Sequence, residues 1–428
     1  SVDVNLDRII LSANWMGACG VKGQDAALYD GVSAASSFCQ ELGVSIPVGK
    51  DSLSMKTSWK DQAGEDKTVV SPVSLVVSAA APVYDIRNNL LPMFAESVRD
   101  SSLLLIDLGH GKDRLGGSVY SQVTQRFDSV TPDMEDPKEL KKFLELIRSL
   151  SAKGAILAYH DRSDGGLAAA LCEMMFASHV GVEIVADALV SKDRTLNQAL
   201  FNEELGAVIQ VARGRAAEVE RDFEAAGMGW SLKYLGNLTQ DDHLNIYLEG
   251  KCVLSEDRVD LQKAWNEVSW QIARMRDNPE CADSEYELIS DKHNGGLVLT
   301  MGFDPEENLA APFINTGVRP KVAILREQGV NSQNEMASAF LQAGFDAVDV
   351  HMTDLLEGRA KLADFVGLAA CGGFSYGDVL GAGGGWAKTI LHNAKLQSSF
   401  RRFFDNVYVG RLQRLPDDFS AQGSYPRS

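Results

Sequence analysis

Two carboxylates, a hydroxyl group, an imidazole and a guanidinium group lie close together between Ala158 and Leu167, in the sequence Ala-Tyr-His-Asp-Arg-Ser-Asp-Gly-Gly-Leu. The apolar run 154–159 that leads into this stretch predicts a buried strand, and the helix formers that follow it recur at helical spacing. We therefore expect residues 160–166 to form the turn between a strand and a helix. This turn would carry all five of the reactive side chains.

The residue types in this turn suit a phosphate ligand that is held together with a divalent cation. Free N–H groups at a helix start attract anions, and Gly165 and Gly166 let a ligand approach the backbone closely. Asp161 is placed to hold a hard cation such as Mg²⁺, and Ser163 is placed to donate to a phosphate oxygen. The other interpretation is that Ser163 or Asp164 only caps the helix, while the glycines serve the turn. The stretch alone favours neither interpretation.

The composition is that of an ordinary globular protein, since 45% of the 428 residues are apolar and 23% are charged. The net charge of −18 argues against a main role in binding nucleic acid or anionic membranes, although a bound cation can still attract phosphate. We expect no membrane span, because no apolar run reaches the ~18 residues that a span needs. The first residues do not resemble a signal peptide, and they lack an initiator Met, so we expect a cytoplasmic chain that begins inside a longer protein.

The six cysteines are scattered along the chain and form no Cys-x-x-Cys pair. This spacing favours reduced, mostly buried thiols over a disulfide framework or a zinc site.

The first hundred residues predict one helix and several short strands. Apolar residues recur at three- and four-residue steps over Gln24–Leu42, so we expect a helix there that ends at Gly43. We expect strands at 9–11, 44–48 and 71–81, and loops at 12–20 and 58–68. The polar segment 49–56 offers Lys50 and Lys56 to phosphate and Asp51 to a cation. Taken without context, this segment is better explained as a solvated turn.

Strands and helices alternate through the middle of the chain, which predicts α/β or α+β layers. Asn202, Glu203 and Glu204 come directly before an apolar run that predicts a strand. The other expected strands are 102–109, 182–185, 232–237 and 244–248, and the expected helices are 137–151, 215–226 and 256–280.

A third unit begins near Arg319 with strands at 321–325, 345–350 and 365–371 and a helix at 331–344. This order predicts a parallel sheet with a ligand crevice beyond the carboxyl ends of its strands. Gly372 and Gly373 follow one such end, where their N–H groups could stabilise an oxyanion, although an ordinary tight turn explains them equally well. The first turn lacks Gly-x-Gly-x-x-Gly, which disfavours a dinucleotide-binding fold.

Long runs of this sequence resemble the C-terminal part of the large single-chain phosphoribosylformylglycinamidine synthases, also called formylglycinamide ribonucleotide amidotransferases. Because these runs keep many polar and glycine residues in order, they are more specific than any single short motif. The matching runs are 11–16, 46–57, 158–167, 201–211, 274–283, 319–332 and 370–383.

The resemblance implies the fold and the division of the chain. The expected fold is a pair of α+β aminoimidazole-ribonucleotide-synthetase-like lobes, followed by an incomplete α/β class I glutamine amidotransferase domain. The implied boundaries are 1–100 for the N-type lobe, 101–259 for the C-type lobe, 260–318 for a connector, 319–406 for the truncated amidotransferase domain and 407–428 for an aberrant tail.

The resemblance also implies a reaction of purine biosynthesis. The family uses ATP to phosphorylate the amide oxygen of formylglycinamide ribonucleotide, and ammonia from glutamine then displaces phosphate to give formylglycinamidine ribonucleotide. In the matching turn the family's Asp binds Mg²⁺ and its Ser binds ATP, which correspond to Asp161 and Ser163. We assign Lys50, Gly165 and Gly166 to ATP binding as well, Asp51, His160 and Glu203 to the neighbourhood of the nucleotide or substrate, and Gly372 and Gly373 to the oxyanion turn.

The sequence departs from the family at both ends. The family's N-terminal half, with the first lobe pair, has no counterpart. The family's nucleophile motif, Gly-Val-Cys-Asn-Gly-Cys-Gln, should follow Phe404 closely, but no Cys occurs after Cys371. We therefore expect no glutaminase activity and little synthetase turnover from this chain, because glutamine hydrolysis needs a thiolate and its base. The isolated part from Arg319 onward is also expected to aggregate, since a truncated sheet exposes apolar edges.

The tail 407–428 resembles nothing in the family, and a shift of reading frame would explain it. Residues 410–417 can be encoded by a string that, read one base later, gives Gly-Val-Cys-Asn-Gly-Cys-Gln. We therefore hypothesise a one-base slip near Asn406, with the nucleophile's codon straddling Leu412 and Gln413. Sequencing the DNA tests this, and an intact frame with other codons would refute it.

Two other functions stay open at this point. The chain could be an inactive structural or binding module derived from the enzyme, or a different ATP-using relative such as a small-subunit synthase. The amidotransferase start at Arg319 argues against the second. The main expectation is a ligase fragment that binds nucleotide and Mg²⁺ through Asp161.

Overall fold

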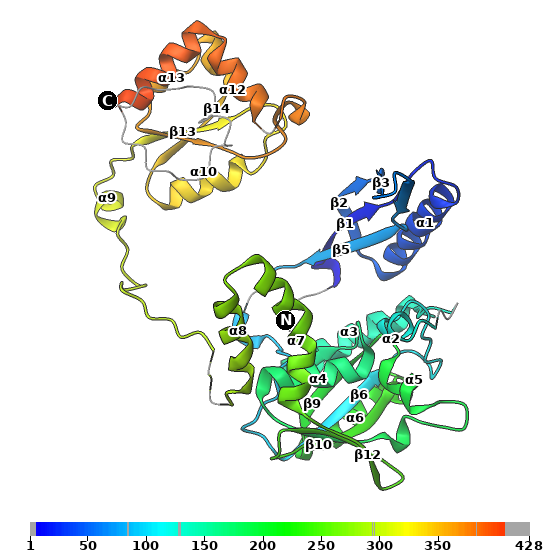
Figure 1. Ribbon diagram of the computed structural model, residues 1–428. Coiled ribbons are helices and arrows are strands. Elements are labelled where there is room, and N and C mark those ends of the chain that lie inside the picture. The colour runs from blue at the N-terminus through cyan, green and yellow to red at the C-terminus, as the bar shows by residue number, and fades with distance from the viewer. Residues whose placement is uncertain are drawn as a thin grey trace. The chain divides into compact units, whose positions relative to one another are not determined.

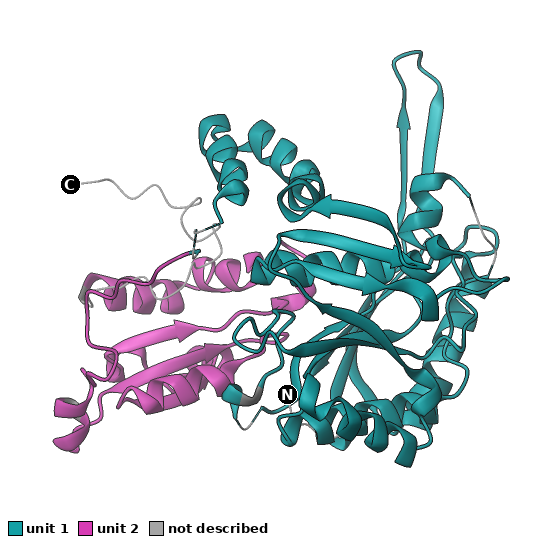
Figure 2. Ribbon diagram, turned by 90° about the horizontal axis from the view of Figure 1, so that it is seen from below, with its two compact units in different colours: residues 1–296 teal, residues 297–428 magenta. Residues whose placement is uncertain are grey.

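The computed structural model describes residues 6–83, 85–126, 130–292, 294, 296–381 and 383–406. The tail 407–428, for which we hypothesised a frameshift, lies outside the described residues. The chain divides into two compact units, residues 1–296 and residues 297–428 (Figure 2). The first unit contains an N-terminal lobe, residues 6–82, and a C-terminal lobe, residues 101–257.

The N-terminal lobe has a three-stranded sheet in the order β2-β1-β5 and one long helix (Figure 1). Strand β1 pairs in parallel with β2 and antiparallel with β5. Strands β3 and β4 form a separate antiparallel hairpin. The elements are β1 (Ile10–Met16), α1 (Gln24–Leu42), β2 (Ser45–Ser52), β3 (Lys56–Lys60), β4 (Asp66–Val70) and β5 (Ser74–Ala80).

Helix α1 has the predicted bounds, and the backbone N–H of Gly43 closes it by donating to the carbonyl of Cys39. Three predictions in this lobe were wrong. Strand β1 continues through the expected loop to Met16, β2 continues through Lys50 and Asp51, and the expected loop 58–68 belongs to the β3–β4 hairpin. These segments have no alternating apolar face, because β2 and β3 are exposed along almost their whole length, so periodicity could not reveal them.

The C-terminal lobe is built on a seven-stranded sheet in the order β12-β11-β8-β10-β6-β9-β7. Its neighbouring strands are antiparallel except for β8 and β11. The strands are β6 (Ser101–Asp107), β7 (Ile156–Asp161), β8 (Val182–Val185), β9 (Gly206–Ala212), β10 (Leu232–Leu238), β11 (His243–Leu248) and β12 (Lys251–Asp257). The helices are α2 (Val119–Thr124), α3 (Pro137–Ala152), α4 (Gly166–Ser178), α5 (Leu196–Phe201) and α6 (Ala216–Ala225).

Both faces of this sheet are covered, because its central strands are apolar on both sides. On β6, Leu103 and Leu105 pack against α4 on one face, whereas Leu104 and Ile106 pack against α3 and α6 on the other. This alternation follows from the period of two along a strand. A sheet that is buried on both faces holds its strand ends rigidly, and the predicted site lies at one of those ends.

Two helices, α7 (Arg258–Arg276) and α8 (Pro279–Glu287), follow the sheet. They contact each other, since the indole of Trp270 stacks on the ring of Tyr286 with centroids 4.3 Å apart.

The second unit contains a three-stranded parallel sheet in the order β14-β13-β15, as the sequence predicts. Apolar residues of β13 pack on both faces of this sheet, with Ala323 and Leu325 on one and Val322 and Ile324 on the other. Its elements are α9 (Ala311–Asn315), β13 (Lys321–Arg326), α10 (Gln333–Gln342), β14 (Asp346–His351), α11 (Met352–Glu357), β15 (Gly367–Ala370), α12 (Gly384–Leu391) and α13 (Ala394–Asn406).

All six cysteines are free, as expected, but the expectation that most are buried is wrong. Of the six, only Cys371 is buried, and Cys19, Cys252 and Cys281 are exposed. Over the described part of the chain, no helix has the length and apolar character that crossing a membrane requires.

Candidate functional site

A cavity of about 470 Å³ lies where β7 ends and α4 begins. Asp161, the last residue of β7, lines this cavity together with Ser163 and Glu203. The start of the turn is bonded to the sheet, because the N–H of Arg162 donates to the carbonyl of Gly206, 2.8 Å away, on the neighbouring strand β9. The structure therefore brings three of the predicted site residues to one cavity, at the predicted strand-to-helix turn.

Asp161 is available to a ligand in this cavity. Its side chain is 67% exposed, and Nδ1 of His160 lies 3.8 Å from its Oδ1 atom. No group of three or more His, Cys, Asp or Glu residues in the described ranges is arranged to hold a metal ion. A closed protein site for a metal is therefore not formed by these residues, whereas Mg²⁺ commonly binds one or two carboxylates and takes its other ligands from water and substrate phosphates.

The two glycines of the turn take conformations that other residues rarely adopt, with φ of +80° at Gly165 and +69° at Gly166. A Cβ atom on Gly166 would lie 2.6 Å from the carbonyl oxygen of Asn202, so a side chain there would also clash with backbone. Glycine is thus required for the turn, which agrees with the interpretation that these glycines serve the turn.

The expectation that these glycines offer free N–H groups needs a correction. The N–H of Gly165 donates to Oε1 of Glu203 at 2.9 Å, and the N–H of Gly166 donates to the carbonyl of Ser163 at 2.9 Å. The same Oε1 atom of Glu203 accepts the N–H of Val119 at 2.9 Å. A carboxylate of the chain itself therefore occupies the place at the start of α4 where a phosphate oxygen was expected.

A buried ion cluster behind the turn fixes its position. Arg162, whose side chain is fully buried, donates from Nη2 to Asp107 at 2.7 Å and from Nε to the carbonyl of Glu204 at 2.6 Å. Lys233 also contacts Asp107, at 2.9 Å. Burial alone would raise the pKa of Asp107, but the charges of Arg162 and Lys233 hold it well below its usual range. The turn is thus tied to the ends of β6 and β9.

Sequence reasoning did not identify this cluster, because its members lie far apart in the chain. Only the position of Asp107 at the end of a buried strand hinted at it. Glu204, which is fully buried, likewise pairs with a residue distant in sequence, since Nε and Nη2 of Arg114 donate to its carboxylate at 2.7 and 2.8 Å.

The remaining predicted residues of the first unit lie elsewhere. Nε2 of His160 pairs with Glu173 at 2.8 Å, and Nδ1 lies 2.8 Å from the carbonyl of Asp161, so this ring supports the turn without lining the cavity. Nζ of Lys50 donates to the carbonyl of Asp51 at 3.1 Å and to the hydroxyl of Ser52 at 2.9 Å. Lys50 and Asp51 are exposed on β2 and are not among the residues that line the cavity.

In the second unit, Gly372 and Gly373 follow β15. The carbonyl of Gly372 accepts the N–H of Asn331 at 3.0 Å, and the N–H of Phe374 donates to Gly329 at 2.9 Å. Within the described residues no hydrogen bond uses the N–H groups of the two glycines themselves. Cys371 precedes them, and burial raises the pKa of its thiol, so it is a poor nucleophile.

Three family models match the chain, one for each part of the molecule. They describe an FGAR-AT PurM_N-like domain over residues 1–82, the C-terminal domain of AIR synthase related proteins over residues 101–249, and a CobB/CobQ-like glutamine amidotransferase domain over residues 319–408. The first model is named for the formylglycinamide ribonucleotide (FGAR) amidotransferases. The other two correspond to the C-type lobe and the amidotransferase domain that the resemblance to this family implies for the rest of the chain. Together, in this order along the chain, the three models support an amidotransferase of the FGAR type.

Solved structures also resemble the chain, at low identity. PurLQS from Thermotoga maritima is 11% identical, with 58% of this chain and 37% of that chain covered and a TM-score of 0.40. T. maritima PurL complexed with ATP is 11% identical over 59% and 38% of the two chains, with a TM-score of 0.40. E. coli HypE, a hydrogenase maturation protein, is 17% identical over 58% and 72%, with a TM-score of 0.40.

The chain spans less than two fifths of the length of those T. maritima proteins. The synthetase-like and amidotransferase-like parts are nonetheless both present, as the sequence predicted for the fold.

Proposed function

We propose that this chain serves an ATP-dependent carbon–nitrogen ligase of purine biosynthesis, and that the cavity beside Asp161 binds nucleotide phosphates with Mg²⁺. The observation that carries the proposal is that the exposed carboxylate of Asp161 and the hydroxyl of Ser163 line one cavity at a turn anchored by buried ion pairs. The family models supply the reaction class.

The donor set fits a metal that is shared with a ligand. Asp161 would hold Mg²⁺ by one carboxylate, and the ion would supply the positive charge that attracts phosphate to a chain of net charge −18. Ser163 is exposed in the same cavity and would donate its hydroxyl to a phosphate oxygen. Glu203 would give up its hydrogen bond with Gly165 when a phosphate reaches the start of α4.

The proposed overall reaction takes formylglycinamide ribonucleotide, ATP and glutamine as substrates. The amide oxygen of the ribonucleotide takes the terminal phosphoryl group of ATP and releases ADP. Ammonia from glutamine then attacks the carbon of this phosphorylated amide, and phosphate leaves, which gives formylglycinamidine ribonucleotide. We further propose that a first pair of synthetase lobes, which the family carries in its N-terminal half, is the partner that completes the synthetase site. Gly372 and Gly373 would stabilise the oxyanion during glutamine hydrolysis once a nucleophile is supplied.

Calorimetric titration of the full chain with a non-hydrolysable ATP analogue, with and without Mg²⁺, tests the nucleotide site. We expect Asp161→Asn to weaken binding about tenfold with Mg²⁺ and to leave binding without Mg²⁺ unchanged, because only the metal-dependent contact is removed. Ser163→Ala should weaken binding a few-fold under both conditions, because its contact is to phosphate.

Asp193→Asn is the matched control, since it removes an exposed carboxylate of the same lobe that does not line the cavity. It should bind as the unmodified chain does. A folded chain that binds no nucleotide under either condition would refute the proposal and favour the inactive binding module instead. Equal affinities of Asp161→Asn and the unmodified chain with Mg²⁺ would refute the metal assignment.

A further inference from the structure

The carboxylate of Glu203 connects the starts of two helices in the C-terminal lobe. Its Oε1 atom lies 2.9 Å from the backbone nitrogen of Gly165, which precedes α4, and 2.9 Å from that of Val119, the first residue of α2. Glu203 also lines the cavity beside Asp161. One oxygen therefore accepts two charge-assisted hydrogen bonds at the edge of the candidate nucleotide site.

The side chain of Glu203 can move although the backbone on either side of it is fixed. Asn202 is buried and donates from Nδ2 to Asp113 at 3.0 Å, and the buried carboxylate of Glu204 pairs with Arg114 at 2.7 Å. Glu203 itself is half-buried and forms no ion pair with any residue that the structure describes. An anion that offers an oxygen to the same N–H donors can therefore replace its carboxylate by a change of side-chain rotamer alone.

A second feature of the cavity indicates an anionic ligand independently of the helix start. Arg162 lines the cavity and is only 3% exposed. Its Nη1 atom is buried and has no hydrogen-bond partner among the described residues. Because a buried donor without an acceptor is unfavourable, an oxygen supplied by a ligand would be stabilised there. The carboxylate of Glu203 does not supply this oxygen.

We propose that Glu203 is an autoinhibitory gate, whose carboxylate takes the place of a phosphate oxygen in the empty chain and must be displaced before nucleotide binds. This inference rests on the proposed function of the cavity beside Asp161. Because only chains with the carboxylate turned away accept the phosphate, the measured affinity is the intrinsic affinity multiplied by the fraction of such chains. Loss of a residue that lines a site usually weakens binding, whereas loss of this carboxylate should strengthen it.

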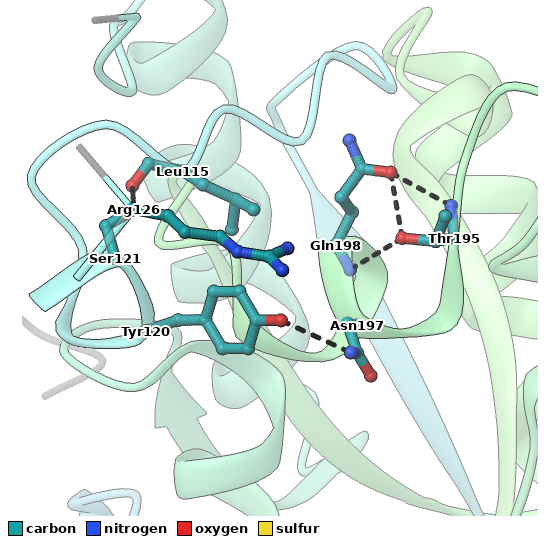
Figure 3. Close-up of a pocket in the computed structure, with 7 residues that line it drawn as sticks. All are labelled: Leu115, Tyr120, Ser121, Arg126, Thr195, Asn197 and Gln198. Carbon is teal, nitrogen blue, oxygen red and sulfur yellow. Dashed lines mark hydrogen bonds between the residues drawn. The ribbon is translucent and has the colours of Figure 1, made fainter. Parts of the chain in front are cut away.

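The gate also couples the cavity to α2. A phosphate at the start of α4 would replace the acceptor of Gly165, whereas the N–H of Val119 would lose its acceptor. The next two residues, Tyr120 and Ser121, line a second cavity of the lobe, where the hydroxyl of Tyr120 accepts a hydrogen bond from Asn197 at 3.2 Å (Figure 3). We therefore expect nucleotide binding to loosen the start of α2.

Calorimetric titration of the full chain with a non-hydrolysable ATP analogue and Mg²⁺ tests the gate. Glu203→Gln should bind about tenfold more tightly than the unmodified chain, because a neutral amide accepts the two N–H groups more weakly and does not repel phosphate. The matched control is Asp164→Asn, which removes an exposed carboxylate that lines the same cavity but holds neither N–H group. It should tighten binding by at most about threefold, since solvent screens its charge.

Hydrogen exchange at Val119 provides the second readout. In the unmodified chain the exchange should become several-fold faster when the nucleotide binds, and in Glu203→Gln it should be faster already without nucleotide.

Three results would overturn the gate and leave the nucleotide site in place, provided that the unmodified chain binds. These are a Glu203→Gln chain that binds no more tightly, an Asp164→Asn chain that gains as much affinity, and exchange at Val119 that is unchanged or slower on binding. If neither the unmodified chain nor Glu203→Gln binds nucleotide, the proposed function is refuted together with the gate. Binding by Glu203→Gln alone would support both.

Discussion

The two lobes of the first unit bury their apolar residues to very different extents. Among residues 6–82, the buried apolar side chains are those of Ala13, Ala18 and Leu42, and Val48 and Val77 are 61% and 46% exposed on β2 and β5. The C-terminal lobe instead has a buried cluster on each face of its sheet. It therefore supplies its own core, whereas the N-terminal lobe leaves apolar surface of the kind that marks an interaction site.

The difference bears on function because the candidate nucleotide site lies in the lobe that has the core. Asp161 ends a strand whose neighbours are buried on both faces, and the Asp107–Arg162 pair fixes the turn that follows it. Lys50 and Asp51, the candidates in the N-terminal lobe, lie on a strand that is exposed along almost its whole length. The C-terminal lobe itself therefore fixes the position of Asp161, whereas the N-terminal lobe does not fix Lys50 and Asp51 in this way.

The largest expected loss of stability is found by comparing one leucine-to-alanine truncation in each lobe. Leu103→Ala on β6 removes a fully buried side chain and should lower the free energy of unfolding by about 3–5 kcal/mol. Leu75→Ala on β5, where the side chain is 39% exposed, should lower it by less than about 1 kcal/mol. Chemical denaturation of the two variants measures both values, and equal losses would contradict the comparison.

Much of the C-terminal lobe could be predicted because its elements are buried in regular patterns. The strand before the site, the helix after it and the strand after Glu203 follow from apolar runs and helical spacing, although β7 continues through His160 to Asp161 and α4 already begins at Gly166, inside the expected turn. The hairpin 56–70 could not be predicted in this way, because an exposed hairpin has no apolar face. Arg162, Asp107 and Lys233 could not be connected either, since a sequence does not reveal which distant charges meet inside a fold.

The next effect comes from breaking the buried pair at the turn. Asp107→Asn should cost about 3 kcal/mol or more, because it leaves the buried Arg162 and the half-buried Lys233 without their carboxylate. The matched change in the N-terminal lobe, Asp66→Asn, breaks the exposed pair with Lys60 and should cost less than about 1 kcal/mol. Thermal unfolding of both variants provides the measurement, and a cost for Asp107→Asn as small as that for Asp66→Asn would show that the cluster does not hold the turn.

The same carboxylate predicts a dependence of stability on pH. The pKa of Asp107 is lower in the folded chain than its ordinary value of 3.8, so its contribution is complete well above pH 3.8 and is lost as the pH falls through that value toward the folded pKa. The free energy of unfolding should therefore fall less steeply below about pH 4 in Asp107→Asn than in the unmodified chain. Parallel acid profiles would contradict the assignment.

A smaller effect separates two glycines that both have positive φ. Gly166→Ala should cost about 2 kcal/mol or more, because the added Cβ meets the carbonyl of Asn202 as well as an unfavourable φ. Gly23→Ala at the start of α1 meets no atom within 4 Å and should cost about 1 kcal/mol, from its φ of +88° alone. Denaturant midpoints compare the two, and an equal or smaller cost at Gly166 would mean that the turn is not constrained as described.

The smallest effect concerns the carboxylate at the start of α4. Glu203→Gln should cost about 1 kcal/mol, because two charge-assisted hydrogen bonds, from Gly165 and Val119, become neutral ones. Asp25→Asn weakens the exposed hydrogen bond from Gly20 in the N-terminal lobe and should cost less than about 0.5 kcal/mol. Hydrogen exchange at Gly165 and Gly20 reports the two losses locally; an unchanged rate at Gly165 would exclude Glu203 as its acceptor.

A crystal structure of the full chain with Mn²⁺ and a non-hydrolysable ATP analogue tests the central claim most directly. The account predicts the metal at about 2.0–2.2 Å from a carboxylate oxygen of Asp161, with the nucleotide phosphates in the cavity that Ser163 and Glu203 also line. Metal and phosphates bound at another place, with the Asp161 carboxylate free of both, would contradict it.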